Sequence, residues 1–241
     1  GVLGGSGSIS ALGLEGGSVS GANVVGGLVG YNLAGSITAS YASGTVNGND
    51  IVGGLVGVNS GTITASYATG SVSGDENVAG LIGYNFVGSI TASYWNTDTT
   101  GQANGIGLSD SPGEESVTGL TSAQMTDKSL FTEFDFSVTP TELSWMILDG
   151  VTAPYLGWQD MGLLGQGTES DPFQIATLAD LRALSETSVV GFWSAGVHYE
   201  LTADIDATDT SSWNVGDHDN DTDTANQAMG FSPIGNGTDQ F

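Results

Sequence analysis

Apolar and polar positions recur along the first hundred residues with a nearly constant spacing. Two apolar residues mark each copy and recur 26 or 27 residues apart: Leu28, Leu55 and Leu81, and Ile37, Ile63 and Ile90. A fixed period in this range is typical of a solenoid, in which no single repeat can bury its apolar face alone. We therefore expect the copies to stack into one continuous core.

Within each copy, the phrase Ser/Thr-Ile-Thr-Ala-Ser-Tyr occupies residues 36–41, 62–67 and 89–94. Strict alternation places Ile, Ala and Tyr on one face and Ser and Thr on the other, which predicts a half-buried strand. Glycines every few residues favour corners with positive φ or close backbone contacts, and they disfavour helix by about 1 kcal/mol each. We expect one repeat per coil of a parallel β-solenoid, with these interior ladders: Leu28/Leu55/Leu81, Ile37/Ile63/Ile90, Tyr41/Tyr67/Tyr94 and Val46/Val72.

The same residues carry a resemblance to a known family. Gly-Gly-Leu-Val-Gly-Tyr-Asn at 26–32, followed by Ser-Ile-Thr-Ala-Ser-Tyr-Ala-Ser-Gly-Thr-Val at 36–46, resembles the GLUG motif. That motif is found in large bacterial surface proteins, including adhesins similar to filamentous haemagglutinin and some IgA-specific metallopeptidases. The resemblance covers about residues 24–97. It implies a right-handed parallel β-helix with short capping helices at a cell surface, where the repeats serve as scaffold.

Changes in composition divide the chain into three segments. We expect GLUG-type repeats in residues 1–100, a cap that closes the array in 101–165, and an incomplete opening segment of a following unit in 166–241. The last segment resembles the one that opens such arrays, yet here it comes last. We therefore expect one register of a tandem protein, with two open solenoid ends whose strand edges need partners.

Short elements are expected outside the repeats. A helix over 119–131 would use Thr121 or Ser122 as N-cap and turn Met125 and Leu130 inward. Strands are predicted in 143–148, 153–158 and 198–206. A helix over 177–186 is predicted from its spacing of leucines and from a capping box between Thr177 and Asp180.

The charge balance narrows the classes of partner. The formal net charge is −25, from 27 acidic and 2 basic side chains, Lys128 and Arg182. Nucleic acid and anionic membrane surfaces are excluded as partners because both require clustered Lys and Arg. No cysteine is available for disulfides or thiolate metal sites. No apolar run approaches 18 residues, so we expect no membrane insertion by this segment.

One acidic stretch is a candidate calcium site. Alternate carboxylates could converge on a hard cation from Asp217, Asp219, Asp221 and Asp223. The match to an EF-hand loop is incomplete, because Thr222 replaces its glycine and Ala228 replaces its bidentate glutamate; a solvated acidic loop is the alternative. A second acidic group, Asp204 with Asp206 and Asp209, is expected to consist of turn residues at a strand end.

Three further sets of residues could form surfaces or ladders. Outward hydroxyls would form a flat ladder able to bind ice or a glycan, or simply a polar strand face: Thr38/Ser40, Thr64/Ser66 and Thr91/Ser93. A stacked ladder at one corner is expected from Asn32, Asn59 and Asn85. Either core positions or sugar-stacking platforms are expected for Trp95, Trp145, Trp158, Trp193 and Trp213.

Catalysis has little support in the sequence. There is no cysteine and no His-Glu-x-x-His pattern, and His198 and His218 have no neighbouring nucleophile motif. We expect a non-enzymatic, secreted bacterial or archaeal surface protein that serves as a structural or adhesive stalk or fibre. Its partners would be further units of the same protein, joined end to end, and surface glycans. The alternatives are a carbohydrate- or ice-binding module and a non-catalytic spacer in a larger surface enzyme.

Overall fold

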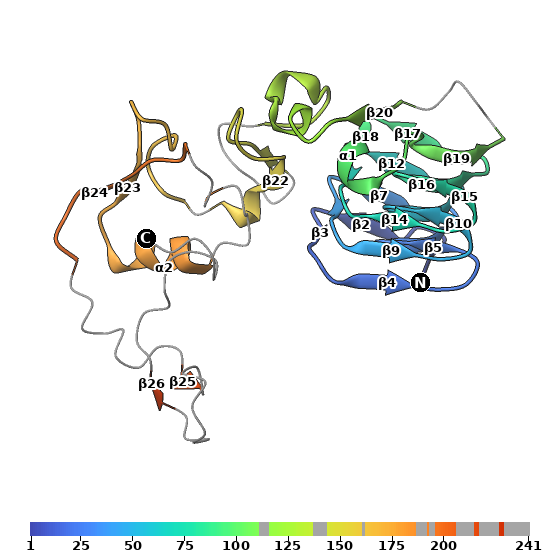
Figure 1. The fold of residues 1–241 in the computed structure, drawn as a ribbon, viewed down its shortest axis with the longest axis horizontal. Coiled ribbons are helices and arrows are strands. Elements are labelled where there is room, and N and C mark those ends of the chain that lie inside the picture. Colours follow the sequence, from blue (N-terminus) through green and yellow to red (C-terminus); the bar gives the residue numbers. More distant parts are fainter. Residues whose placement is uncertain are drawn as a thin grey trace. The chain divides into compact units, whose positions relative to one another are not determined.

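The computed structural model describes residues 1–110, 116–136, 144–160, 162–186, 192, 196–205, 215–216 and 227–228. The chain divides into two compact units, Gly1–Trp158 and Gln159–Phe241. The first unit is built on a parallel β-solenoid, in which successive coils lie one above another (Figure 1). The predicted fold class, mainly β with a solenoid of stacked parallel strands, is confirmed.

Five parallel sheets run along the solenoid, and each coil adds a strand to most of them. Sheet A has five strands: β1 (Val2–Leu3), β6 (Val29–Asn32), β11 (Val56–Asn59), β16 (Ile82–Asn85) and β19 (Ile106–Ser109). Sheet B has four: β2 (Ser8–Ser10), β7 (Ser36–Thr38), β12 (Thr62–Thr64) and β17 (Ser89–Thr91). Sheet C has five: β3 (Gly13–Leu14), β8 (Tyr41–Ala42), β13 (Tyr67–Ala68), β18 (Ser93–Asn96) and β20 (Val117–Leu120). Sheets D and E have three each: β4 (Ser18–Ser20), β9 (Thr45–Asn47) and β14 (Val72–Ser73); β5 (Val25–Gly26), β10 (Asp50–Gly53) and β15 (Glu76–Ala79).

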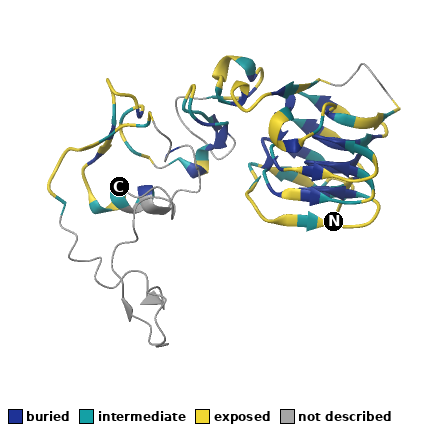
Figure 2. Ribbon diagram, in the orientation of Figure 1, coloured by how far each residue is buried: buried dark blue, intermediate teal, exposed yellow. Residues whose placement is uncertain are grey.

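The interior of the solenoid is filled by columns of identical or similar apolar side chains. Ile63 lies directly between Ile37 and Ile90 in the register of sheet B, and all three are almost fully buried. Leu55 is likewise fully buried. Figure 2 shows the buried residues concentrated in the inner coils. The predicted ladders of leucine, isoleucine and valine are therefore confirmed, because equivalent residues stack one coil apart.

The predicted tyrosine ladder has a different location. Tyr41, Tyr67 and Tyr94 do stack in the register of sheet C, but they point out of the solenoid, while Ala42 and Ala68 point into it. The prediction of an interior ladder was wrong because strict alternation does not hold across the corner between sheets B and C. One alanine per coil adopts positive φ there and shifts the alternation by one residue: Ala11, Ala39, Ala65 and Ala92.

Glycines have both of the roles expected for them, but in different coils. Positive φ occurs at Gly5, Gly16 and Gly17 in the first coil, whereas within residues 18–100 it occurs at alanines, Ile51 and Asn77. The glycines of the repeats instead allow neighbouring backbones to touch. A Cβ atom at Gly54 would overlap the carbonyl oxygen of Gly80 in the next coil, and one at Gly27 would overlap the carbonyl oxygen of Gly54.

Trp95 closes the interior at the C-terminal end of the solenoid. It occupies the column of Ala68 in the preceding coil and Gly119 in the following one. Its indole is buried and donates to the carbonyl oxygen of Gln102 at 3.0 Å. A short helix, α1 (Thr97–Thr100), follows β18. The large ring thus fills the core where the regular repeat ends.

The segment after β20 forms two 3-10 turns, η1 (Gln124–Thr126) and η2 (Lys128–Leu130), where we predicted one short helix. The side chain of Asp127 accepts from the backbone N–H of Ser129 at 2.9 Å, so it begins a second turn where a helix would have continued. Met125 is buried as predicted. An antiparallel pair follows, β21 (Trp145–Met146) and β22 (Tyr155–Leu156), and then η3 (Gly157–Gln159).

The second unit contains a β-α-β element. Its parts are β23 (Phe173–Ile175), α2 (Leu178–Glu186) and β24 (Tyr199–Leu201); the short strands β25 (Val215–Gly216) and β26 (Gln227–Ala228) pair with each other. The predicted capping box is confirmed, because Thr177 N–H donates to Asp180 at 2.8 Å and Asp180 N–H donates to the Thr177 hydroxyl at 3.2 Å. Phe173 packs on the rings of Phe192 and Tyr199.

We expect Gly54→Ala to lower the free energy of unfolding by about 3 kcal/mol, because the added methyl group must separate two coils. The matched change Ala65→Gly relaxes a residue held at φ 46° and should alter stability by less than about 1 kcal/mol. Urea denaturation followed by circular dichroism measures both. Equal effects of the two changes would contradict the close-contact role of Gly54.

Candidate functional surfaces of the solenoid

The outward tyrosines of sheet C form an aromatic column. We call Tyr41, Tyr67 and Tyr94 the tyrosine column. The rings of Tyr41 and Tyr67 stack with centroids 4.9 Å apart and planes inclined by 6°. The column is buried although it lies outside the solenoid, because the chain returns over it. We call the returning segment, residues 121–136 and 144–158, the strap.

The strap contacts the coils in the reverse of their chain order. Phe131 and Phe134 pack on Tyr94 of the fourth coil, at centroid distances of 4.9 and 5.4 Å. Trp145 lies against Tyr67 and Tyr41 of the third and second coils, at 5.5 and 6.1 Å. One apolar cluster therefore ties three coils to a single segment.

Hydrogen bonds fix the strap at two further points. The Tyr67 hydroxyl donates to the carbonyl oxygen of Pro154 at 2.5 Å. The indole N–H of Trp158 donates to the carbonyl oxygen of Ala11 in the first coil at 3.0 Å. The strap thus extends from the fourth coil to the first and braces the solenoid along its side.

The structure shows the roles of three of the five tryptophans. Trp95 and Trp145 are buried core residues, which was one of the two predicted roles, the other being a platform for sugar stacking. Trp158 is 52% exposed and serves as an anchor for the strap. Trp193 and Trp213 lie outside the described residues.

The strands of the first coil form one edge of the described sheets. Each of these strands lies at the end of its sheet and pairs on one side only: β1, β2, β3 and β4. We call these strands the first-coil edge. Leu12 and Leu14 on this edge are each 40% exposed. The register places Leu14 in the column of Ala42, so a large apolar residue stands where the inner coils have a small one.

The serine half of the predicted hydroxyl ladder is buried inside the solenoid. Ser40, Ser66 and Ser93 are fully buried at the corner, where the Ser66 hydroxyl accepts from the Ser40 N–H at 3.2 Å and donates to the Thr64 carbonyl oxygen at 2.9 Å. Their outward placement was wrong because the alanine corner shifts the alternation. The outer face of sheet B instead carries two hydroxyl columns: Ser8, Ser36, Thr62 and Ser89, and Ser10, Thr38, Thr64 and Thr91.

The asparagine ladder is confirmed. The Asn32 side chain donates to Asn59 at 2.9 Å, and Asn59 donates to Asn85 at 3.0 Å. All three residues are fully buried. These amides are therefore structural, because their hydrogen-bonding groups are used between coils.

The predicted calcium residues Asp217, Asp219, Asp221 and Asp223 lie outside the described residues, as do Asp206 and Asp209. Within the part of the chain that is described, no three or more His, Asp or Glu side chains are grouped as a metal site requires. The same part contains no helix with the length and apolar character needed to cross a bilayer.

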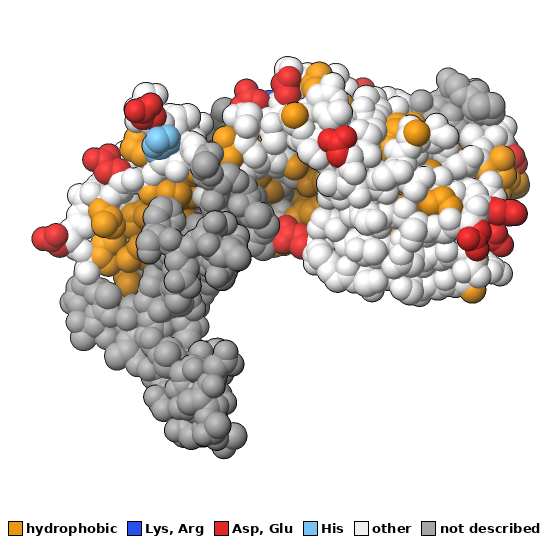
Figure 3. All heavy atoms as spheres, viewed as in Figure 1, with side chains coloured by type: hydrophobic (Ala, Val, Ile, Leu, Met, Phe, Trp, Pro, Cys, Tyr) orange, Lys and Arg blue, Asp and Glu red, His pale blue; other side chains and the backbone are white. Residues whose placement is uncertain are grey.

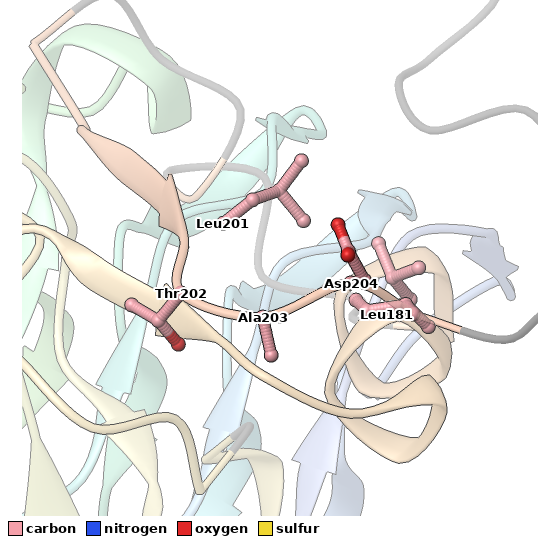
Figure 4. Close-up of a pocket in the computed structure, with 6 residues that line it drawn as sticks. Leu181, Leu201, Thr202, Ala203 and Asp204 are labelled. Carbon is pink, nitrogen blue, oxygen red and sulfur yellow. The ribbon is translucent and has the colours of Figure 1, made fainter.

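A hollow in the second unit contains the one described member of the second acidic group. Leu181 of α2 and the segment 201–205 line an open depression of 660 Å³ (Figure 4). Asp204 lies beside Leu181 in this view, and the other labelled residues are Leu201, Thr202 and Ala203. A single carboxylate among apolar groups offers no ligand set for a metal ion.

Comparisons with known proteins agree with this architecture. A model of the GLUG motif matches residues 21–47. Halomucin of Haloquadratum walsbyi (strain DSM 16790 / HBSQ001) is 42% identical over 77 residues, which are 31% of this chain and 1% of halomucin. The match thus spans a very small part of that protein. No solved structure gives a significant match.

These findings support the predicted GLUG resemblance in one repeat directly, and the register extends the same pattern to the neighbouring coils. A solenoid with a GLUG match and a likeness to halomucin fits a structural protein of a surface. Figure 3 shows acidic side chains distributed over the visible face of both units.

We expect alkaline pH to release the strap. Burial raises the pKa of the Tyr67 phenol well above its usual value, and Tyr41 and Glu15 raise it further. Because the unfolded phenol has a pKa of about 10, the stabilisation by neutral Tyr67 is complete below pH 10 and is lost as the pH rises toward the folded pKa. Tryptophan fluorescence during an alkaline titration measures the transition.

Tyr67→Phe keeps the ring and removes the ionisable group, so the alkaline transition should move to higher pH. Tyr199→Phe in the second unit is the control, because burial also raises the pKa of that phenol. An unchanged transition in Tyr67→Phe would show that another group releases the strap.

Truncation of Trp145 in the strap should lower the free energy of unfolding much more than truncation of Trp158. Trp145 is 1% exposed, and Trp145→Ala should lower the free energy of unfolding of the first unit by about 4 kcal/mol. Trp158→Ala removes a half-exposed ring and one hydrogen bond, which should cost about 1 kcal/mol. Thermal unfolding compares the two. Similar losses would mean that the strap does not pack on the tyrosine column in solution.

Proposed function

We propose that the chain is a structural element of a cell-surface stalk or fibre, in which solenoids of this type stack end to end. The observation that carries the proposal is the first-coil edge, where four strands end their sheets at one level of the solenoid. An edge of this kind is a template for pairing with further strands. The partner that fits it is another coil of the same repeat.

The coil-to-coil contacts inside the molecule show what such a partner would supply. Each inner coil donates and accepts backbone hydrogen bonds on both sides, as when Leu28 N–H donates to Leu55 O at 2.9 Å and Leu55 N–H donates to Leu81 O at 2.9 Å. The first coil has this arrangement on one side only. Its exposed leucines, Leu12 and Leu14, add apolar area that stacking would remove from water.

The acidic composition of the chain supports a location at a cell surface or outside the cell. A net charge of −25 keeps separate molecules soluble, and strong self-repulsion makes their association depend on dissolved salt. The likeness to halomucin, whose name indicates a mucin-like protein, supports a surface or extracellular location in the same way. An adhesive role rests on the GLUG resemblance, and it is tested through the ligand considered below.

The test places charges on the edge. Leu12→Lys/Leu14→Lys puts two ammonium groups where the next coil would pack, so association should be abolished or weakened at least tenfold. Leu164→Lys is the matched control, because Leu164 is 72% exposed in the second unit. Electron microscopy and sedimentation velocity at several protein and salt concentrations measure assembly.

Elongated particles of the unchanged chain and of the control, together with single particles of the edge variant, are the expected result. Single particles of all three at every concentration would contradict end-to-end stacking. A chelator added to the same samples tests the calcium prediction for Asp217–Asp223: softening or shortening of the fibres supports it, and unchanged fibres oppose it.

A further inference from the structure

A second outward column on the solenoid is apolar, and most of its residues are at least partly exposed in the described part of the chain. In the register of sheet A, the outward residues of successive strands form what we call the apolar stripe: Val2, Tyr31, Val58, Tyr84 and Leu108. At the adjacent corner, further exposed apolar residues flank it: Leu33, Phe86 and Val87. Most of the exposed large apolar residues of the first unit lie on this one surface.

Close backbone packing and side-chain contacts hold the stripe in place. A glycine precedes each stripe residue in the four later strands: Gly30, Gly57, Gly83 and Gly107. A Cβ atom at Gly57, Gly83 or Gly107 would overlap backbone atoms of neighbouring strands. The Tyr84 hydroxyl donates to Asp110 at 2.7 Å, and its ring meets the edge of Phe86 at 6.0 Å. Val58 is only 8% exposed between the two tyrosines, which are more open.

The size of the stripe distinguishes between possible occupants. Four strand spacings of about 4.8 Å make it about 20 Å long, and it is one residue wide on each strand. A stable protein–protein contact needs about 800 Å² from each partner. The stripe is therefore too small to hold a second copy of the chain by itself, but its length suits a narrow, extended polymer.

Charge excludes an anionic polymer. Both basic residues, Lys128 and Arg182, lie outside the strands of the solenoid, and Asp110 lies on the stripe itself. Asp50 and Glu76 stand next to each other on the neighbouring sheet E. A neutral polymer avoids repulsion by these carboxylates, and hydroxyl groups on it could donate to them.

The spacing of the two tyrosine rings indicates the kind of polymer that fits the stripe. Tyr31 and Tyr84 are two coils apart, which is about 10 Å. In an extended β-linked polysaccharide every second sugar presents the same apolar face, so equivalent faces recur at about this distance. We propose that the apolar stripe binds a neutral β-linked polysaccharide, with Tyr31 and Tyr84 stacking under alternate sugars. This site does not depend on end-to-end stacking.

The experiment uses the full chain and four probes. Sedimentation with microcrystalline cellulose and with crystalline chitin measures binding to the polymers, and titration calorimetry with cellohexaose and chitohexaose measures affinity. The two families of probe distinguish plain from N-acetylated sugars. Binding to at least one family is expected.

Variants locate the binding surface. Tyr31→Ala and Tyr84→Ala should each weaken binding by about tenfold, and together they should abolish it. Tyr84→Phe keeps the ring and should stay within about threefold of the unchanged chain. Thr64→Ala/Thr91→Ala on the outer face of sheet B and Leu12→Lys/Leu14→Lys on the first-coil edge are controls that should bind normally.

Three results would overturn the proposal: no binding of any probe by the unchanged chain, equal binding by the double alanine variant, or loss of self-association in that variant, which would make a second copy the occupant. Thermal unfolding shows whether the alanine variants fold. If they do not, Tyr31→Leu/Tyr84→Leu keeps apolar bulk without aromatic rings and gives the same test, because loss of binding then reports on stacking. Binding retained in the edge variant separates this site from the proposed stacking of solenoids.

Discussion

The backbone contact between one coil and the next is the constraint on which the rest of the structure depends. At Gly27 and Gly54 the backbone of the next coil approaches so closely that no side chain fits between them. This contact fixes the separation and register of the coils. Every column then follows from that register, whether apolar, amide, hydroxyl or aromatic. A side chain added at these positions would disturb all of the columns at once, because the coils are connected through all five sheets.

The period of the repeat was enough to predict the parallel solenoid, because a coil of constant length can bury its isoleucines and leucines only against the same residues of the next coil. Alternation within a copy was not enough to place Tyr41 and Ser40. Both lie just beyond Ala39, whose positive φ shifts which face the following residues occupy. The residue type does not predict this corner, because alanine rarely adopts a positive φ. The position of such an exception is decided by the closure of the coil.

The two aromatic columns show why covering segments are harder to predict than repeats. Met125, Phe131 and Trp145 could be recognised as apolar residues that need burial, but their partners lie in earlier coils, as far back in the chain as Tyr41. Their target follows only once the tyrosines are known to face outward. The apolar stripe was not predicted for a related reason. Tyr31 and Tyr84 were treated only as parts of the repeat motif, and the third copy of that position is a valine, so the sequence shows no continuous aromatic column. One column is covered by the strap, and most residues of the other are at least partly exposed in the described part of the chain.

The two ends of the solenoid differ, and this difference sets the kind of assembly that the proposed stacking can give. Trp95 fills the core near one end, where the sheets finish at β14, β15, β17, β19 and β20. Leucines and the first-coil edge form the other end. Joining two first-coil edges would set their strands antiparallel and break the columns that hold the inner coils in register. Joining unlike ends keeps the strands parallel and the columns continuous. A head-to-tail contact of this kind does not close on itself, so it produces an open filament rather than a dimer. The lateral strap is compatible with such growth because it braces the side of the solenoid.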